Sequence, residues 1–185
     1  GVTVKIDNPD PETGEGEIIA RGPNIMKGYY QNREQTEEVF TSDGYFRTGD
    51  LGYIDKKGIV YIRGRLKNMI LGPNGENIYP EEIEALINET DYINESLVMQ
   101  YKGKLVARVH LNVELLEQKF HDLKSNAQDF QHQLQHKAEG LTDDLMNHIN
   151  QHVSSNSRLQ MIIIQSDPFE KTPTQKIKRF LYQQI

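Results

Sequence analysis

The 185-residue chain carries a formal net charge of −6 and contains no cysteine. Disulfides, thiolate metal sites and a cysteine nucleophile are therefore excluded, and the acidic balance argues against a nucleic-acid partner. A composition that is 36% hydrophobic and 26% charged is typical of a folded globular protein. No apolar stretch approaches the ~18–20 residues of a membrane span, and no signal peptide is visible. The chain has no initiating Met and opens directly on a strand pattern, so it is expected to be cut from a longer protein.

Short strands and turns are predicted for the N-terminal third of the chain. Apolar residues alternate with polar ones over positions 2–6, which is typical of a strand, and residues 17–21 and 60–63 form further strand-like runs. Asn32 is a favourable N-cap for a short helix over residues 33–40. These patterns predict a β-rich region whose notable polar residues lie in loops.

The middle of the chain changes to a mixture of helix and strand. Pro80 has the position of a first helical residue, followed by acidic side chains in the first turn, and predicts a helix to about residue 89. Residues 97–101 and 104–112 then predict a hairpin that turns at residues 102–103.

Helical periodicity dominates the following segment. An apolar stripe predicts a helix over residues 114–139, broken by Gly140, and a second helix from Thr142 to about residue 153. A buried strand is predicted at residues 159–165 and a short basic helix at residues 176–184. The stripe consists of Leu116, Phe120, Leu123, Ala127, Phe130 and Leu134.

Three segments resemble, in the right order, the signature motifs of the adenylate-forming enzymes. Residues 45–52 resemble their (Y/F)RTGD motif, residues 64–84 their hinge-and-loop motif, and residues 171–179 their terminal PxTxxGKxxR-type motif, with Gln175 where the family usually has Gly. One such motif is weak, whereas three in order are specific. The terminal motif and the helical insertion resemble most those of bacterial long-chain fatty acid–CoA ligases.

This resemblance implies an α+β fold in two parts. Residues 1–66 would be the C-terminal β-rich portion of the large nucleotide-binding domain. Residues 67–185 would be the small C-terminal lid domain, a mixed sheet with helices that carries a helical insertion at about residues 114–153.

Asp50 and Arg65 are the nucleotide-binding residues that the resemblance implies. A carboxylate has two acceptor oxygens and can hold both hydroxyls of a ribose, and a guanidinium forks onto paired ribose or phosphate oxygens. The residues alone have plainer interpretations, a turn aspartate and a surface arginine, because both are common. The three motifs together favour the nucleotide role.

Lys176 is the catalytic lysine that the resemblance implies. Attack of a carboxylate on the α-phosphate of ATP joins two anions, so a compact ammonium between them stabilises the transition state. On local sequence alone, Lys176 is one basic residue on a solvated helical face. Lys178 and Arg179, on the same expected helix, are predicted to be solvated charges of little consequence.

The same resemblance makes Lys67 the hinge about which the lid rotates, since a few loop positions usually absorb such a change. Gly75, Glu76 and Asn77 would form the loop that binds coenzyme A and forms the thioester, and glycine permits close approach of a ligand. Local sequence alone describes Lys67 as a solvated lysine and the loop as a turn before a helix.

The implied reaction is that of an acid–thiol ligase. A carboxylate and ATP with Mg²⁺ give an acyl-adenylate and pyrophosphate, and coenzyme A then displaces AMP. The implied partners are the N-terminal large domain of the same protein, a fatty acid and coenzyme A. We expect a cytoplasmic protein with at most peripheral attachment to the inner face of the membrane. The chain alone is expected to be inactive because it lacks the phosphate loop and the acyl pocket.

Two other functions remain open. The same motifs serve adenylation domains that load a carrier protein, and the helices of residues 114–153 would suit an interaction module if their apolar stripe were exposed. His132 and His136, like His148 and His152, have the i,i+4 spacing of metal ligands. No acidic general base lies between them, so we expect surface histidines and no metal site.

Overall fold

The computed structural model describes residues 1–119 and 127–182, with residues 117, 119 and 127–139 described by their backbone alone. The chain divides into two compact units, Gly1–Met69 and Ile70–Ile185. This division lies close to the domain boundary expected after residue 66. The mixture of helices with several sheets confirms the α+β class.

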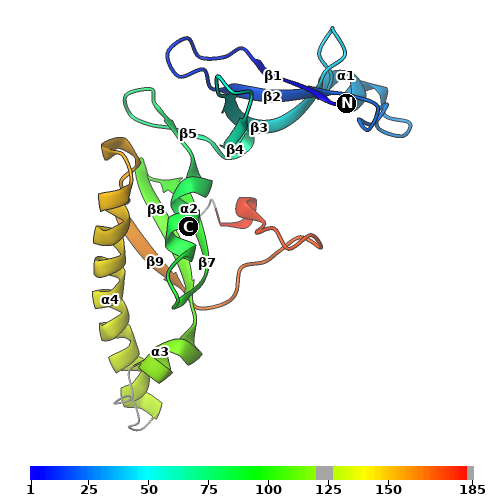
Figure 1. The fold of residues 1–185 in the computed structure, drawn as a ribbon. Coiled ribbons are helices and arrows are strands. Elements are labelled where there is room, and N and C mark those ends of the chain that lie inside the picture. The colour runs from blue at the N-terminus through cyan, green and yellow to red at the C-terminus, as the bar shows by residue number, and fades with distance from the viewer. Residues whose placement is uncertain (120–126, 183–185) are drawn as a thin grey trace. The chain divides into compact units, whose positions relative to one another are not determined.

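The first unit is an antiparallel sheet in which each of four strands pairs with the next along the chain (Figure 1). Asn32 caps its helix as predicted, because its side chain accepts a hydrogen bond of 3.0 Å from the Gln35 amide. The elements of this unit are β1 (Thr3–Asp7), β2 (Gly16–Arg21), α1 (Arg33–Glu38), β3 (Phe46–Ile54), β4 (Val60–Arg65) and the 3₁₀ helix η1 (Leu66–Asn68).

An irregularity in β3 needs a glycine. The pairing of β3 with β4 shifts between Leu51 and Gly52. A Cβ atom on Gly52 would lie 2.0 Å from the carbonyl oxygen of Tyr61, far inside van der Waals contact. Glycine therefore lets the two strands approach at the bulge.

The second unit contains a three-stranded sheet, β7-β8-β9, and a small two-stranded sheet, β5-β6. Its elements are β5 (Ile70–Leu71), β6 (Asn77–Ile78), α2 (Pro80–Asn88), β7 (Ile93–Tyr101), β8 (Lys104–Leu111), α3 (Val113–Lys119), α4 (Ala127–His152), η2 (Ser155–Ser157), β9 (Met161–Gln165) and η3 (Arg179–Leu181). The predicted hairpin is confirmed. Its two turn residues, Lys102 and Gly103, have φ of 48° and 76°, as a type I′ turn requires.

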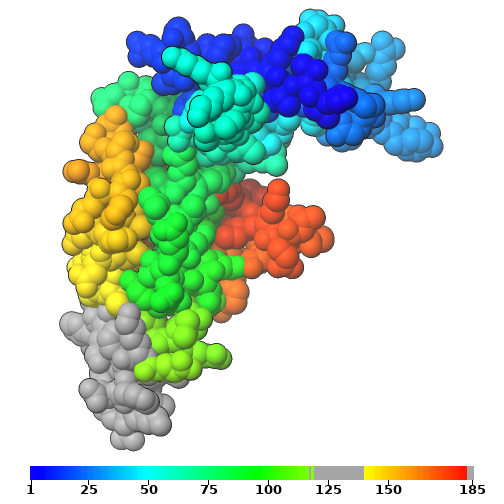
Figure 2. Space-filling view, viewed as in Figure 1, coloured from blue at the N-terminus to red at the C-terminus, as the bar shows by residue number. Residues whose placement is uncertain are grey.

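Helix α4 connects β8 to β9, which pair in parallel. It runs without interruption through Gly140, so the predicted break and the separate second helix are wrong. A glycine inside a helix costs only about 1 kcal/mol, which packing of Leu145 and Ile149 into the core outweighs. Figure 2 shows the yellow-to-orange surface of α4, from residue 140, lying against the green surface of the sheet and α2.

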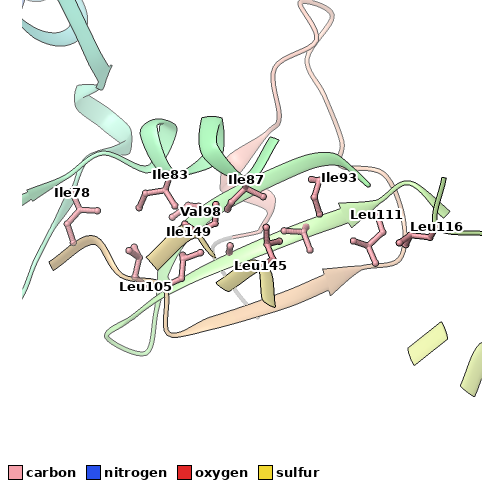
Figure 3. Close-up of a cluster of buried hydrophobic side chains, with 13 residues drawn as sticks. Ile78, Ile83, Ile87, Ile93, Val98, Leu105, Leu111, Leu116, Leu145 and Ile149 are labelled. Atoms are coloured by element: carbon pink, nitrogen blue, oxygen red, sulfur yellow. The ribbon is translucent and has the colours of Figure 1, made fainter. Parts of the chain in front are cut away.

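Side chains from α2, the sheet and α4 meet in one apolar core (Figure 3). Ile87 and Val106 have no exposed surface, and Ile149 is 1% exposed. Leu116, the first residue of the predicted stripe, is also buried in this core. The other stripe side chains lie outside the described residues, so exposure of the stripe stays untested. In contrast to the prediction, β9 is only partly buried.

No helix within residues 1–119 and 127–182 combines the length and the apolar character that crossing a bilayer requires.

Candidate active site

Asp50 and Arg65 face each other across two paired strands of the first unit. They are direct partners in the register of β3 and β4, and Arg65 Nε lies 2.9 Å from Asp50 Oδ1. The guanidinium also donates a hydrogen bond of 3.2 Å to the Thr48 carbonyl oxygen. The two side chains are 27% and 48% exposed, so carboxylate and guanidinium form a small polar site open to a ligand.

The backbone around Asp50 is fixed by side chains of the same motif. The Thr48 hydroxyl donates to the Ile18 carbonyl at 2.7 Å and accepts from the Asp50 amide at 3.0 Å. Glu17 accepts from the Gly49 amide at 3.1 Å, which holds Gly49 at a φ of 72° that suits glycine.

Arg47 completes this support. Its guanidinium pairs with Glu17 at 2.7 Å and with Asp7 at 2.8 Å, and hydrogen bonds to the two carboxylates raise the pKa of Arg47. Sequence reasoning missed Arg47 and Glu17 as supporting residues. The available signal was the placement of opposite charges on neighbouring predicted strands.

The predicted thioester loop is the tight β5–β6 hairpin of the second unit. The Gly72 amide donates to the Glu76 carbonyl at 2.8 Å, and Gly75 has a φ of 84°. The Glu76 carboxylate folds back and accepts from the Asn74 amide at 3.0 Å. Glu76 therefore shapes the hairpin, whereas Gly75 and Asn77 are exposed at its surface.

A cavity of about 350 Å³ lies beside this hairpin. Polar groups from three parts of the second unit line it, among them Asn74, Glu76, Gln100, Arg158 and Gln160. The hairpin that the resemblance links to coenzyme A therefore borders a space with both cationic and amide groups.

Lys176 lies on a second tight hairpin and not on the predicted helix. Lys171 and Ile177 form a β-bridge, and the Thr172 amide donates to the Lys176 carbonyl at 2.8 Å. The Thr172 hydroxyl also accepts from the Lys176 amide at 3.2 Å. These local bonds offer the backbone an alternative to a helix. Of the helix expected at residues 176–184, the described chain up to residue 182 therefore contains only the single 3₁₀ turn η3 (Arg179–Leu181). The Lys176 side chain is exposed just past the turn.

Gln175 occupies the turn of this hairpin with a φ of 62°. The left-handed region suits glycine, the usual residue of the family motif, and costs other L-residues roughly 1–2 kcal/mol. The hairpin thus keeps the backbone conformation expected of the motif although the glycine is replaced.

Arg179 was predicted to be a solvated charge, and this prediction is wrong. Its guanidinium lies 2.5 Å from the Glu84 carboxylate of α2 and donates to the Val98 carbonyl at 3.3 Å. Burial raises the pKa of the Glu84 carboxyl, an effect that the charge of Arg179 opposes. Lys178 is closer to the predicted solvated charge, because its Nζ lies 3.3 Å from the carboxylate of the exposed Glu170.

Lys67, the predicted hinge, is an exposed residue of η1. The Met69 amide donates to the Arg65 carbonyl at 3.1 Å and closes this single turn. The chain divides into its two units directly after Met69. Lys67 therefore lies near the end of the first unit, just before the division, and its role as a hinge remains a prediction.

No cluster of three or more potential metal ligands occurs in the described part of the chain. The His148 and His152 rings are tilted by 48° with centroids 4.6 Å apart, and His152 Nδ1 lies 2.8 Å from the His148 carbonyl oxygen. The side chains of His132 and His136 lie outside the described residues.

Solved structures of acyl-activating enzymes contain a fold similar to that of this chain. The fold matches ATP-bound MatB from Rhodopseudomonas palustris with a TM-score of 0.70 and 26% identity, over 100% of this chain and 34% of that one. It also matches the AMP complex of O-succinylbenzoate coenzyme A synthetase from Bacillus subtilis with a TM-score of 0.74 and 23% identity, again over 100% and 34%. No family model matches the chain.

Curated relatives give the same assignment from sequence. A long-chain-fatty-acid–CoA ligase of Drosophila melanogaster is 49% identical over 89 residues, which cover 48% of this chain and 13% of the ligase. A 2-succinylbenzoate–CoA ligase of Listeria monocytogenes is 44% identical over 85 residues, covering 46% and 18%. The chain is therefore homologous to the CoA ligases of the adenylate-forming family.

Two features of these relatives bear on function. The chain spans only 13–20% of the length of the curated relatives it matches. The relatives also differ in the acid that they are named for, since sulfoacetate–CoA and indoleacetate–CoA ligases are among them, and they come from fly and plant as well as bacteria. The expected bacterial long-chain type is thus one of several.

Proposed function

We propose that the chain forms one side of the nucleotide site and the lid of an ATP-dependent acid–thiol ligase, a long-chain fatty acyl-CoA synthetase. The Asp50–Arg65 pair carries the proposal, because it presents a carboxylate and a guanidinium together at an open site. Long-chain ligases among the relatives support the choice of acid. The large domain, ATP with Mg²⁺, a fatty acid and coenzyme A are the proposed partners, in the cytoplasm or at the inner membrane face.

In this proposal the ribose of ATP binds at Asp50. One carboxylate oxygen, Oδ1, is engaged by Arg65 in the structure, and a carboxylate has further acceptor capacity on both oxygens. The ribose hydroxyls would therefore donate to the Asp50 carboxylate while it stays paired with Arg65. The Arg65 guanidinium would at the same time face ribose or phosphate oxygens. Thr48 and Glu17 keep the Asp50 backbone in place during this exchange.

Lys176 would act in the first half-reaction, when the fatty acid carboxylate attacks the α-phosphate and pyrophosphate leaves. Its ammonium would stabilise the negative charge that gathers between these two groups. Rotation about Lys67 would then replace the Lys176 hairpin with the Gly75–Asn77 loop, beside which the thiol displaces AMP.

The test of this function uses the longer protein in which the large domain precedes the chain. Pyrophosphate release should depend on a fatty acid, and coenzyme A should then convert the acyl-adenylate to acyl-CoA. The 185-residue chain alone should show no turnover. A preference for a short or aromatic acid would reject the long-chain assignment, and a preference for an acyl carrier protein over coenzyme A would favour the carrier-loading alternative.

Asp50→Ala should weaken nucleotide binding in both half-reactions, because the ribose is held throughout. Losing hydrogen bonds to a charged group typically costs ~1.5–3 kcal/mol, or roughly ten- to a hundredfold in affinity. Calorimetric titration with ATP and with a non-hydrolysable acyl-adenylate measures the effect.

Asp10→Ala is a suitable control for that variant, since Asp10 is an exposed loop residue whose carboxylate accepts hydrogen bonds from its neighbours Glu12 and Thr13. Unchanged affinity of the Asp50 variant for both ligands would remove Asp50 from the site.

Lys67→Pro should separate the two half-reactions. Proline fixes φ near −65° and disfavours helical dihedrals at the preceding Leu66, so the connection between the units loses its freedom to rotate. If the adenylating orientation is the one retained, acyl-adenylate still forms while thioester formation falls. Quenched-flow measurement of both products gives the result, with Lys67→Ala as the matched control. Normal thioester formation by Lys67→Pro would show that the hinge lies elsewhere.

A further inference from the structure

The segment that carries Lys176 is closed at its base. Phe169 is 3% exposed and meets the Tyr182 ring edge-on, with centroids 5.0 Å apart and an interplanar angle of 83°. The Tyr182 hydroxyl accepts a hydrogen bond of 2.7 Å from the Glu170 amide. We call residues 169–182 the terminal loop; it is coloured orange to red in Figure 1.

Arg179 joins the terminal loop to the body of the second unit through ion pairs with two carboxylates of α2, Glu84 at 2.5 Å and Glu81 at 3.7 Å. Glu84 is 9% exposed, and its carboxylate accepts from Arg179 at 2.5 Å and from the Val98 amide at 2.6 Å. Arg179 returns a hydrogen bond to the Val98 carbonyl, at 3.3 Å. The Arg179 side chain thus attaches the terminal loop to α2, through Glu84, and to β7, through the Val98 carbonyl oxygen.

A separate ion pair attaches the other strand of the hairpin. Lys171 Nζ contacts the Glu95 carboxylate of β7, and the two side chains are 32% and 16% exposed. The hairpin of Lys176 is therefore anchored on both sides, by Arg179 after the turn and by Lys171 before it.

The tip of the hairpin has little support of its own. Residues 173–176 are exposed, and an isolated two-stranded hairpin is at best marginally stable in water. The direction in which the tip projects is then decided by the anchors at its base. Of the two, the Arg179–Glu84 pair is the more buried and the richer in hydrogen bonds.

Helix α2 also follows directly on the Gly75–Asn77 loop, through Ile78 and Tyr79 to its first residue, Pro80. Glu84 thus lies on the element that connects the proposed thioester loop to the hairpin of the proposed catalytic lysine. Because α2 packs in the core through Ile83 and Ile87, the tie is made to a rigid part of the unit.

We infer that Arg179 and Glu84 are positioning residues for Lys176, which hold its hairpin to α2 so that the ammonium reaches the reacting groups in the adenylating orientation. The inference rests on the proposed function of Lys176. Neither residue touches the substrates. Their effect is on the placement of a charge, and a misplacement of about 1 Å can cost on the order of 10²-fold in rate.

The test measures both half-reactions in the longer protein that carries the large domain. Arg179→Gln should lower the rate constant of acyl-adenylate formation by roughly 10- to 100-fold, with KM for ATP and thioester formation from supplied acyl-adenylate within about twofold of the parent. Arg179→Lys should retain part of the rate, because it keeps the charge but loses the forked contact with Glu84 and Val98.

Lys178→Gln is the matched control, since its pair with Glu170 is exposed and should matter little. Removing one partner leaves a buried charge and endangers folding, so the double variant Glu84→Gln with Arg179→Gln removes both. It should fold and still show the selective loss. Amide hydrogen exchange at Gln175 and Lys176 should be faster in it than in the parent.

Lys176→Ala serves as the reference for these outcomes. If it leaves adenylation intact, the proposed role of Lys176 fails, and the positioning role fails with it. If Lys176→Ala strongly lowers the rate of adenylation while both Arg179 variants and the double variant keep the parental rate, only the positioning role is overturned. Equal losses in both half-reactions, together with a lower melting temperature, would also overturn it, because they indicate a merely structural pair.

Discussion

Lys176→Ala in the longer protein should reduce acyl-adenylate formation by about 10²–10³-fold, or 2.7–4 kcal/mol, while largely sparing thioester formation from supplied acyl-adenylate. The ammonium is needed where two anions meet, and an active site partly closed to water enlarges its contribution. It would not be needed after the lid has rotated. Pyrophosphate release measures the first half-reaction, and acyl-CoA production from acyl-adenylate measures the second.

Lys178→Ala is the control for this experiment, and the structure excludes Arg179→Ala from that use. Lys178 pairs with the exposed Glu170 at 3.3 Å, whereas Arg179 joins a buried carboxylate. Small and equal losses of the acyl-adenylate formation rate in Lys176→Ala and Lys178→Ala would show that Lys176 is an ordinary surface charge on an exposed turn.

Ile87→Ala should destabilise the second unit by about 2–5 kcal/mol. Ile87 has no exposed surface and lies at the centre of the contact between α2, the sheet and α4 (Figure 3). Truncation would remove apolar contacts and leave a cavity that the close-packed surroundings fill only in part. Urea unfolding followed by circular dichroism gives the change in free energy of unfolding.

Leu115→Ala provides the comparison, because Leu115 is 40% exposed on the short helix α3. Surface substitutions of this kind usually change stability by about 0.5 kcal/mol or less. If both variants unfolded at the same urea concentration as the parent, the packing around Ile87 would not determine the stability of this unit.

Local signals were sufficient for many elements. Asn32 has a side chain that caps a helix, Pro80 has the preset φ of a first helical residue, and the Lys102–Gly103 pair fits a tight turn between strands. Each of these predictions depends on one or two residues and their own backbone. The structure confirms all three.

Tertiary contacts decided the elements that were predicted wrongly. Gly140 is a helix breaker by propensity, but packing of α4 on the core continues the helix through it. The basic residues after Gln175 were predicted to form a helix. Hydrogen bonds across the hairpin and the pair of Arg179 with Glu84 stabilise the hairpin instead. Those partners are 95 residues apart in the sequence, and no local pattern announces such a contact.

The candidate site was predicted in part. The motif of residues 45–52 pointed to Asp50, and the structure places Arg65 directly opposite it. The sequence did not indicate that Arg47 of the same motif pairs with Asp7 and that the Thr48 hydroxyl donates to the Ile18 carbonyl oxygen. A substitution at either residue should therefore disturb the backbone that presents Asp50 while leaving the Asp50 and Arg65 side chains themselves unchanged.

The parallel pairing of β8 with β9 sets an order of assembly for the second unit. The Leu105 amide bonds to the Gln160 side chain across 55 positions, so this edge can close only after the whole α4 crossover has been synthesised. Contacts of such long sequence separation require costly loop closure and form slowly, whereas the β7–β8 hairpin is local and can form early. Until β9 arrives, β8 presents unpaired backbone groups along one side. A chain that ends before Met161 would keep that side open and should self-associate through it.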